Sequence, residues 1–416
     1  MPIVPNVRRL APILILFSNV ARAGSQWVLL WFFAIVGGPH VVGEYSIALA
    51  VSTPIFIVLD MSIRNVFVTL QARVHFLTYL RLRLLTSVIA FSILLVLAYV
   101  VATPPGVLLL IGAIKAVDSI LELAYGVLQK KSDLLRIAWT SLLNSGLTVA
   151  MGVAVFALSN SVELALVGSL AGSVITGVLV LLPILASEQK KPRIKGDSSG
   201  LGSVVRAGIP SGLAYASVSL LTYLPVYFLS ATETTGAVGI FAVVAYFPVF
   251  ANLLFASVQQ VTLNNFVMSH EQEGERGLRK YSVRIFVPLF IVGLILGALT
   301  YVFGGPFIVS VFGPEFAVNQ TILLPVAASL GILPVVYVSG AILLTKNRYT
   351  TQFIAGALAL GVSAIIATLS VDDFDLQTAA SLIFAGTASR ALFAGLAAIW
   401  HLLRSSTSRQ SPLSKI

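Results

Sequence analysis

Residues 187–203 read SEQKKPRIKGDSSGLGS, the longest polar break between apolar segments in this chain. Its Gly, Ser and Lys content is typical of a flexible connection. Twelve apolar stretches flank it, six on each side, near residues 10–36, 44–70, 84–102, 106–128, 137–158, 164–186, 204–230, 236–262, 285–304, 319–344, 350–370 and 377–403. Apolar runs of about 18 or more residues are typical of membrane helices. The pattern predicts an all-α membrane protein with two six-helix lobes, residues 1–186 and 204–416, around a central cavity, and a linker at 187–203.

The composition supports a membrane protein and excludes several other classes. Hydrophobic residues make up 57% of the 416 residues and charged residues only 10%, whereas a soluble domain carries about 25% charged residues. The absence of Cys excludes disulfides and Cys-based metal sites. No P-loop, G-x-S-x-G or H-E-x-x-H motif occurs, and the four His are scattered. We therefore expect no enzyme activity, no metal and no cofactor.

The positions of the basic residues predict the topology. Four of the 26 Lys and Arg lie inside apolar stretches, and the other 22, Arg81 and Arg83 among them, lie in the two termini and in every second connection. The six alternate connections have none. Cytoplasmic loops of membrane proteins carry an excess of Lys and Arg, so both termini and the linker are predicted to be cytoplasmic in a cell membrane. Anionic headgroups, rather than nucleic acid, explain the net charge of +10.

Seven charged residues fall inside the predicted membrane helices. They are Arg22, Arg64, Lys115, Arg390, Asp60, Asp118 and Glu122. A charge at the centre of a membrane helix costs about 2.5–3.5 kcal/mol on insertion scales, and such residues face a protein interior or a wet cavity. Arg22 is the centre of a polar stripe with Ser18, Asn19, Ser25 and Gln26 at helical spacing. These charges indicate a functional site in the membrane.

Two interpretations of the charges remain open. Asp60 with Arg64, and Lys115 with Asp118, have the spacing of neutralising pairs on one helix. Alternatively, the acids Asp60, Asp118 and Glu122 take part in ion coupling. Arg22 and Arg390 have no acid on their own helices, and free guanidinium groups suit phosphate or pyrophosphate. The predicted substrate-binding residues are Arg22, Arg64, Lys115, Arg390, Asn19 and Gln26.

A faint internal repeat matches the two lobes. Val42-Gly43-Glu44-Tyr45 opens the second apolar stretch, and Val238-Gly239-Ile240-Phe241 opens the eighth. Each is followed by a helix with an internal Pro, at Pro54 and Pro248.

Several segments resemble bacterial O-antigen and oligosaccharide flippases of the polysaccharide transporter family, within the multidrug/oligosaccharidyl-lipid/polysaccharide superfamily. They are residues 38–46 (GPHVVGEYS) with 60–64 (DMSIR), residues 126–131 (GVLQKK), and residues 311–316 (VFGPEF) followed by 346–348 (KNR). The resemblance implies an oligosaccharide cargo on an undecaprenyl pyrophosphate carrier and alternating access between two lobes. It also implies partnership with a polysaccharide polymerase and chain-length machinery. Related flippases place cavity arginines where Arg22 and Arg64 fall.

Two other functions remain open. A drug or cation exporter of the same superfamily is the first, although the first helix has Arg22 and no acid. A membrane glycosyl polymerase or ligase is the second, although the outer connections are too short for the large loop such enzymes typically carry.

Overall fold

The computed structural model describes residues 5–69, 75–101, 103–131, 133–188 and 197–404, with the backbone alone for 5–23 and for a few positions that border the gaps or lie between 197 and 211. Within these ranges the chain forms α-helices, two short 3-10 turns and no strand. The helices are α1 (Pro5–Asp60), α2 (Ile63–Thr69), α3 (Phe76–Leu97), α4 (Pro105–Lys130), α5 (Leu134–Ser159), α6 (Val162–Glu188), α7 (Asp197–Thr232), α8 (Thr235–Phe312), α9 (Gln320–Thr345), α10 (Tyr349–Leu369) and α11 (Leu376–Arg404). The 3-10 turns are Pro314–Phe316 and Val371–Asp373.

Two of these helices each contain two membrane spans. Gly38 in α1 has φ 71° and ψ −171°, and Gly274 in α8 has φ 62° and ψ −143°. These backbone angles break a helix and are readily adopted only by Gly. The connections expected near residues 37–43 and 263–284 are therefore single-residue breaks between helical segments.

The number of spans confirms the prediction of twelve. Nine helical segments within the described ranges are long and apolar enough to cross a membrane, and two of them, Gly24–Val68 and Thr235–Phe312, contain the breaks. Helix α4 is absent from the nine because any 18-residue window in it includes Lys115, Asp118 and Glu122. With both breaks and α4 counted, the chain is an all-α protein of twelve membrane helices.

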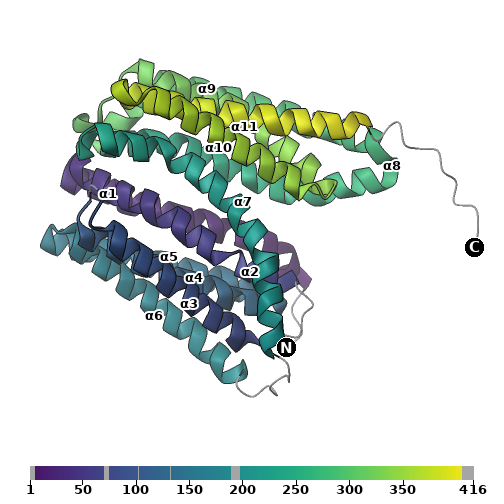
Figure 1. Ribbon diagram of the computed structural model, residues 1–416, viewed down its shortest axis with the longest axis horizontal. Helices are drawn as coiled ribbons and strands as arrows, with labels where there is room; N and C mark the ends of the chain where they lie inside the picture. The colour runs from purple at the N-terminus through teal and green to yellow at the C-terminus, as the bar shows by residue number, and fades with distance from the viewer. Residues whose placement is uncertain (1–4, 70–74, 102, 132, 189–196, 405–416) are drawn as a thin grey trace, which may run out of the picture. The chain divides into compact units, whose positions relative to one another are not determined.

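The chain divides into two compact units. Unit 1 contains Met1–Ser219 and Thr234–Gly239, and unit 2 contains Leu220–Glu233 and Ile240–Ile416. In Figure 1, helices α3 to α6 lie side by side in unit 1, and α9 to α11 lie side by side in unit 2. The division lies inside α7 rather than at the predicted linker, because the first half of α7 packs on unit 1. A side chain at Gly208 or Gly212 would contact the backbone of Met61.

The two glycines of the internal repeat lie in one contact within unit 1. A Cβ atom at Gly43 would collide with the carbonyl oxygen of Thr235, and a Cβ atom at Gly239 would collide with that of Pro39. Gly239 lies 196 residues after Gly43, and Thr235 lies 196 residues after Pro39. The contact is therefore reciprocal. Each Gly packs against the carbonyl group that lies four residues before the Gly of the other repeat.

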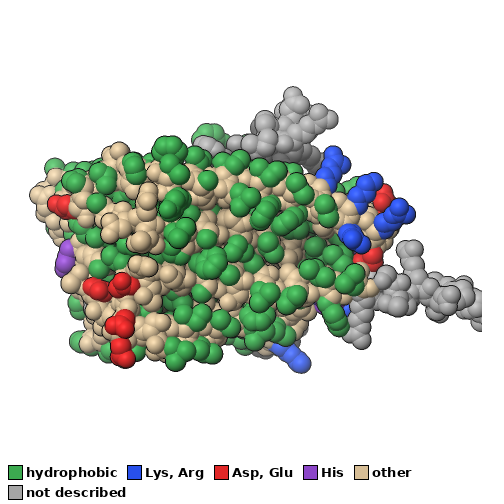
Figure 2. All heavy atoms as spheres, turned by 90° about the horizontal axis from the view of Figure 1, so that it is seen from above, with side chains coloured by type: hydrophobic (Ala, Val, Ile, Leu, Met, Phe, Trp, Pro, Cys, Tyr) green, Lys and Arg blue, Asp and Glu red, His purple; other side chains and the backbone are tan. Residues whose placement is uncertain are grey.

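Basic and acidic connections lie at opposite ends of the helices in unit 2. Lys346, in the α9–α10 turn, forms an ion pair with Glu275 beside the break in α8. At the other end of these helices, Thr232 donates a hydrogen bond to the carbonyl oxygen of Phe374, next to the acidic turn before α11. We call the first end, with Arg276, Arg279, Lys280, Lys346 and Arg348, the basic end of unit 2. On the face drawn in Figure 2, Lys and Arg gather at one end and hydrophobic side chains cover the middle.

Candidate functional site

Helix α4 carries three of the predicted membrane charges of unit 1. Lys115, Asp118, Glu122 and Gln129 follow helical spacing, so they lie along one side of the helix. The opposite side is held in the core of unit 1, where Leu121, Leu123 and Val127 are buried. The apolar residues therefore fix the rotation of α4 about its axis and present the charged residues to its neighbours.

A small polar cavity lies beside α4 in unit 1. Its volume is about 80 Å³, enough for a few water molecules. Its polar lining comes from four helices: Ser25 and Gln26 of α1, Lys115 and Asp118 of α4, Asn144, Ser145 and Thr148 of α5, and Ser169 of α6. The cavity brings Gln26 and Lys115, which were predicted on separate helices, to one space.

Asp118 is held by neutral hydrogen-bond partners in this cavity. Ser173 Oγ lies 2.8 Å from Asp118 Oδ1 and 3.2 Å from Asn144 Oδ1, and Asn144 Nδ2 donates to Asp118 Oδ1 at 3.3 Å. Lys115 lines the same cavity, and it interacts electrostatically with Asp118, three residues further along α4. The cavity thus contains a carboxylate that neutral donors fix in place and an ammonium group that interacts electrostatically with that carboxylate.

Arg64 pairs with Glu122 rather than with Asp60. Its Nη1 atom lies 2.5 Å from Glu122 Oε2, and Nε and Nη2 donate to Gln129 Oε1 at 3.3 and 3.1 Å. The expected Asp60–Arg64 pair is wrong because the helix breaks between the two residues. Met61 and Ser62 have φ angles of 46° and 49°, so the i, i+4 geometry of a continuous helix is lost.

Asp60 instead pairs with Arg83, which the sequence analysis placed in a cytoplasmic connection. Arg83 lies two turns inside α3, only 2% of its side chain is exposed, and its Nη2 forms the ion pair with Asp60 Oδ1. Its Nε donates to the carbonyl oxygen of Ser119 at 3.0 Å. The expectation failed because α3 begins at Phe76, whereas the apolar stretch begins at residue 84. The adjacent polar residues Thr86 and Ser87 were the signal of a buried polar face.

The remaining predicted site residues are distributed as follows. The side chains of Arg22 and Asn19 lie outside the described residues, so their binding roles stay predictions. Gln26 lines the cavity. Arg390 lies in unit 2, on α11.

A second polar cluster, in unit 2, surrounds Tyr337 of α9. Its hydroxyl donates to Asn252 Oδ1 at 2.8 Å, and its carbonyl oxygen accepts from Gln259 Nε2 at 2.8 Å. Arg390 is partly buried and interacts electrostatically with Tyr337, and it makes no hydrogen bond or ion pair within the part of the chain that the structure describes. The sequence analysis missed Asn252 and Tyr337, which have no charge to mark them in an apolar helix.

The described residues contain no group of three or more His, Cys, Asp or Glu that could hold a metal ion. The two clusters can instead bind an anion through Lys115 and Arg390, or move a proton through Asp118.

Comparisons with known proteins agree on the fold. A MATE-family multidrug resistance transporter of the MOP superfamily, solved in an inward-facing conformation, aligns with 94% of this chain and 96% of its own at a TM-score of 0.67 and 14% identity. A MOP superfamily transporter from Pyrococcus furiosus, reported to have a binding pocket of reverse polarity, aligns with 96% of each chain at a TM-score of 0.63 and 15% identity. The chain has the fold of the MOP superfamily transporters.

One sequence relative also covers most of the chain. The capsular polysaccharide biosynthesis protein CapF of Staphylococcus aureus is 22% identical over 369 residues, which are 88% of this chain and 93% of that protein. No family model matches the chain.

Proposed function

We propose that this protein is a flippase that moves undecaprenyl-pyrophosphate-linked oligosaccharide from the cytoplasmic to the outer leaflet by alternating access. The MOP transporter fold supports transport across a membrane. The similarity to a capsular polysaccharide biosynthesis protein supports a glycan cargo. In this proposal the basic ends of the helices and both termini are cytoplasmic, as the positive-inside rule predicts.

The state of the membrane charges carries the proposal. Two acids, Asp60 and Glu122, are paired with arginines, and Asp118 is held by Ser173 and Asn144. Lys115 interacts electrostatically with Asp118 on its own helix, and Arg390 makes no hydrogen bond or ion pair with an acid among the described residues. An organic cation needs an available carboxylate, whereas a pyrophosphate needs available cations. Arg390 is thus a membrane cation without an acid partner in the described part of the chain, whereas each of the three acids has a partner, which favours an anionic cargo.

The residues divide into three roles. In unit 1, Lys115 and Arg22 bind the pyrophosphate, and Gln26 and Asn19 contact the polar groups next to it. In unit 2, Arg390 is a separate anion-binding residue. Asp118 is the coupling carboxylate, because it shares a cavity with Lys115 and a proton on it would change the charge there. Asp60, Glu122 and Arg64 hold α1, α2, α3 and α4 together. The protein itself catalyses no covalent reaction, and a polysaccharide polymerase with its chain-length machinery receives the cargo.

Deletion and complementation test this function. The deletion strain should lose a surface polysaccharide and accumulate lipid-linked repeat units on the inner leaflet. Wild type should restore export, and Lys115→Gln or Arg390→Gln should reduce the rate about tenfold or more, the equivalent of one lost charge-assisted contact. The matched control is Arg81→Gln, which removes an exposed cation of α3. Unchanged polysaccharide in a strain without a second flippase would contradict the proposal.

A drug or cation exporter is the second candidate, because the fold is shared with multidrug transporters and Asp118 lies in a cavity. It predicts that the deletion strain becomes sensitive to cationic drugs while its surface polysaccharide is unchanged. Asp118→Asn would then abolish drug export, and Lys115→Gln would not reduce it.

A further inference from the structure

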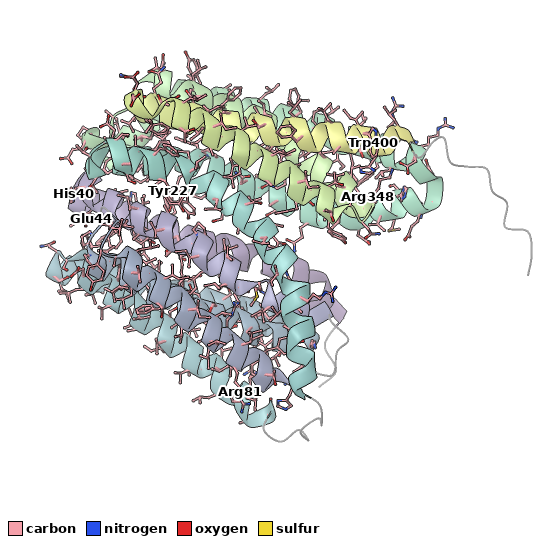
Figure 3. The ribbon with its side chains drawn as sticks, viewed as in Figure 1. His40, Glu44, Arg81, Tyr227, Arg348 and Trp400 are labelled. Carbon is pink, nitrogen blue, oxygen red and sulfur yellow. The ribbon has the colours of Figure 1, made fainter. Side chains whose placement is uncertain are left out.

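The basic end of unit 2 contains a large pocket that neither polar cluster explains. Its volume is about 1150 Å³, at the upper limit of small-molecule sites. Leu263, Val267, His270 and Glu271 of α8 form one wall. The rest comes from Leu344 and Thr345 of α9, Lys346, Asn347 and Arg348 of the following turn, Tyr349 of α10, and Trp400 and His401 of α11. Figure 3 shows Arg348 and Trp400 at the same end of the unit.

The pocket offers an anion site at Arg348. Arg348 is exposed and makes no side-chain hydrogen bond or ion pair within the described ranges, and it occupies the N-cap position of α10 without capping the helix. The first backbone N–H groups of a helix have no partner inside the helix and attract anions. A phosphate in the pocket can therefore bind the guanidinium and the start of α10 together.

The other charges of the pocket set the overall charge of the ligand. Lys346 is already neutralised, since its Nζ lies 2.9 Å from Glu275 Oε1 and 2.5 Å from the carbonyl oxygen of His401. Glu271 is exposed and lines the same pocket. Arg348 and Glu271 thus give one available positive and one available negative charge. Such a pair suits a zwitterion and disfavours a second negative charge on the ligand.

The pocket also has the surroundings of a membrane interface. Trp400 and Tyr349 are 50% and 60% exposed, and these residue types are enriched where headgroups meet the hydrocarbon. Leu263, Val267 and Leu344 provide an apolar wall. We infer that this pocket binds phosphatidylethanolamine: its phosphate lies on Arg348 and the start of α10, its ammonium on Glu271, and the first acyl carbons on the apolar wall.

The test measures lipid binding by native mass spectrometry on the purified full chain. Phosphatidylethanolamine should bind more tightly than phosphatidylglycerol or phosphatidylcholine at equal concentration. Arg348→Gln should weaken binding of phosphatidylethanolamine about tenfold or more, as expected for a lost charge-assisted contact. Glu271→Gln should remove the preference over phosphatidylglycerol, because the repelling carboxylate is gone. Lys280→Gln and Glu273→Gln are matched controls, since both residues are exposed at this end and neither lines the pocket.

Three results would overturn the inference. Equal binding of the three lipids would remove the role of Glu271, and unchanged binding in both pocket variants would place the lipid elsewhere. Full competition by glycerophosphoethanolamine, which has the headgroup without acyl chains, would identify a soluble ligand instead. Because the readout is binding and not export, the inference can fail while the flippase proposal stands.

Discussion

The ion pair between Asp60 and Arg83 makes an asymmetric prediction about stability. Asp60→Asn leaves a guanidinium that is 2% exposed without its carboxylate, and breaking a buried pair in this way costs about 3–5 kcal/mol. Arg83→Met leaves Asp60, whose side chain is 36% exposed and can be hydrated. That change should cost about 1–3 kcal/mol, the penalty for one imperfectly satisfied polar group. The acid should therefore be the more important partner, although it is the more exposed one.

The free energies of unfolding can be measured in mixed detergent micelles with increasing dodecyl sulfate. The four Trp of the chain provide the fluorescence signal. The double variant Asp60→Asn with Arg83→Met should be more stable than Asp60→Asn alone, because the unpaired buried cation is gone. Arg81→Met is the control, since Arg81 is an exposed cation of the same helix.

Two results would refute this reasoning. One is a cost of Asp60→Asn no larger than that of Arg83→Met. The other is a double variant whose cost is the sum of the two single costs, which would mean that the residues do not interact. A double-mutant cycle between Asp60 and Arg64 checks the same geometry. Its coupling free energy should be smaller than that between Asp60 and Arg83.

Three further predictions follow from other contacts. Glu122→Gln should destabilise the protein, with a coupling to Arg64 of about 0.5–3 kcal/mol in a double-mutant cycle, and a coupling of zero would contradict the pair. Burial tends to raise the pKa of Asp375, but the backbone N–H and hydroxyl of Thr378 hydrogen-bond to it and lower the pKa below its ordinary value. The stability advantage of wild type over Asp375→Asn should therefore be present at neutral pH and vanish as the pH falls through this lowered pKa. A difference in free energy of unfolding that persists in acid would contradict the lowered pKa. Gly43→Ala should cost about 1–3 kcal/mol through overpacking, whereas Gly146→Ala, with open space around it, should not destabilise; equal melting temperatures would contradict the close contact at Gly43.

The sequence predicted the fold well because membrane spans and positive charges are strong signals over many residues. It predicted the number of spans. The pairing of the membrane charges was less predictable. The i, i+4 spacing of Asp60 and Arg64 assumes a continuous helix, and no Gly or Pro marks the break at Met61 and Ser62. Arg83 was missed because a polar first turn of a membrane helix looks like a loop.

The site in unit 2 shows a second limit of sequence reasoning. Arg390 was found because a lone cation in an apolar helix is conspicuous. Asn252 and Tyr337 are separated by 85 residues, and only the packing of α8 on α9 brings them together. The lipid pocket depends in the same way on residues from four separate helices.

The reciprocal contact of Gly43 and Gly239 has a consequence for the origin of the chain. In a two-fold symmetric dimer, residue i of one subunit meets residue j of the other, and j meets i. The Gly–carbonyl contacts, with their constant offset of 196 residues, reproduce this arrangement within one polypeptide. Six spans per half is an even number, so both halves enter the membrane from the same side and form a parallel repeat. A six-span ancestor could therefore have formed a homodimer in a single membrane orientation. The fusion of two gene copies would have preserved these two Gly–carbonyl contacts.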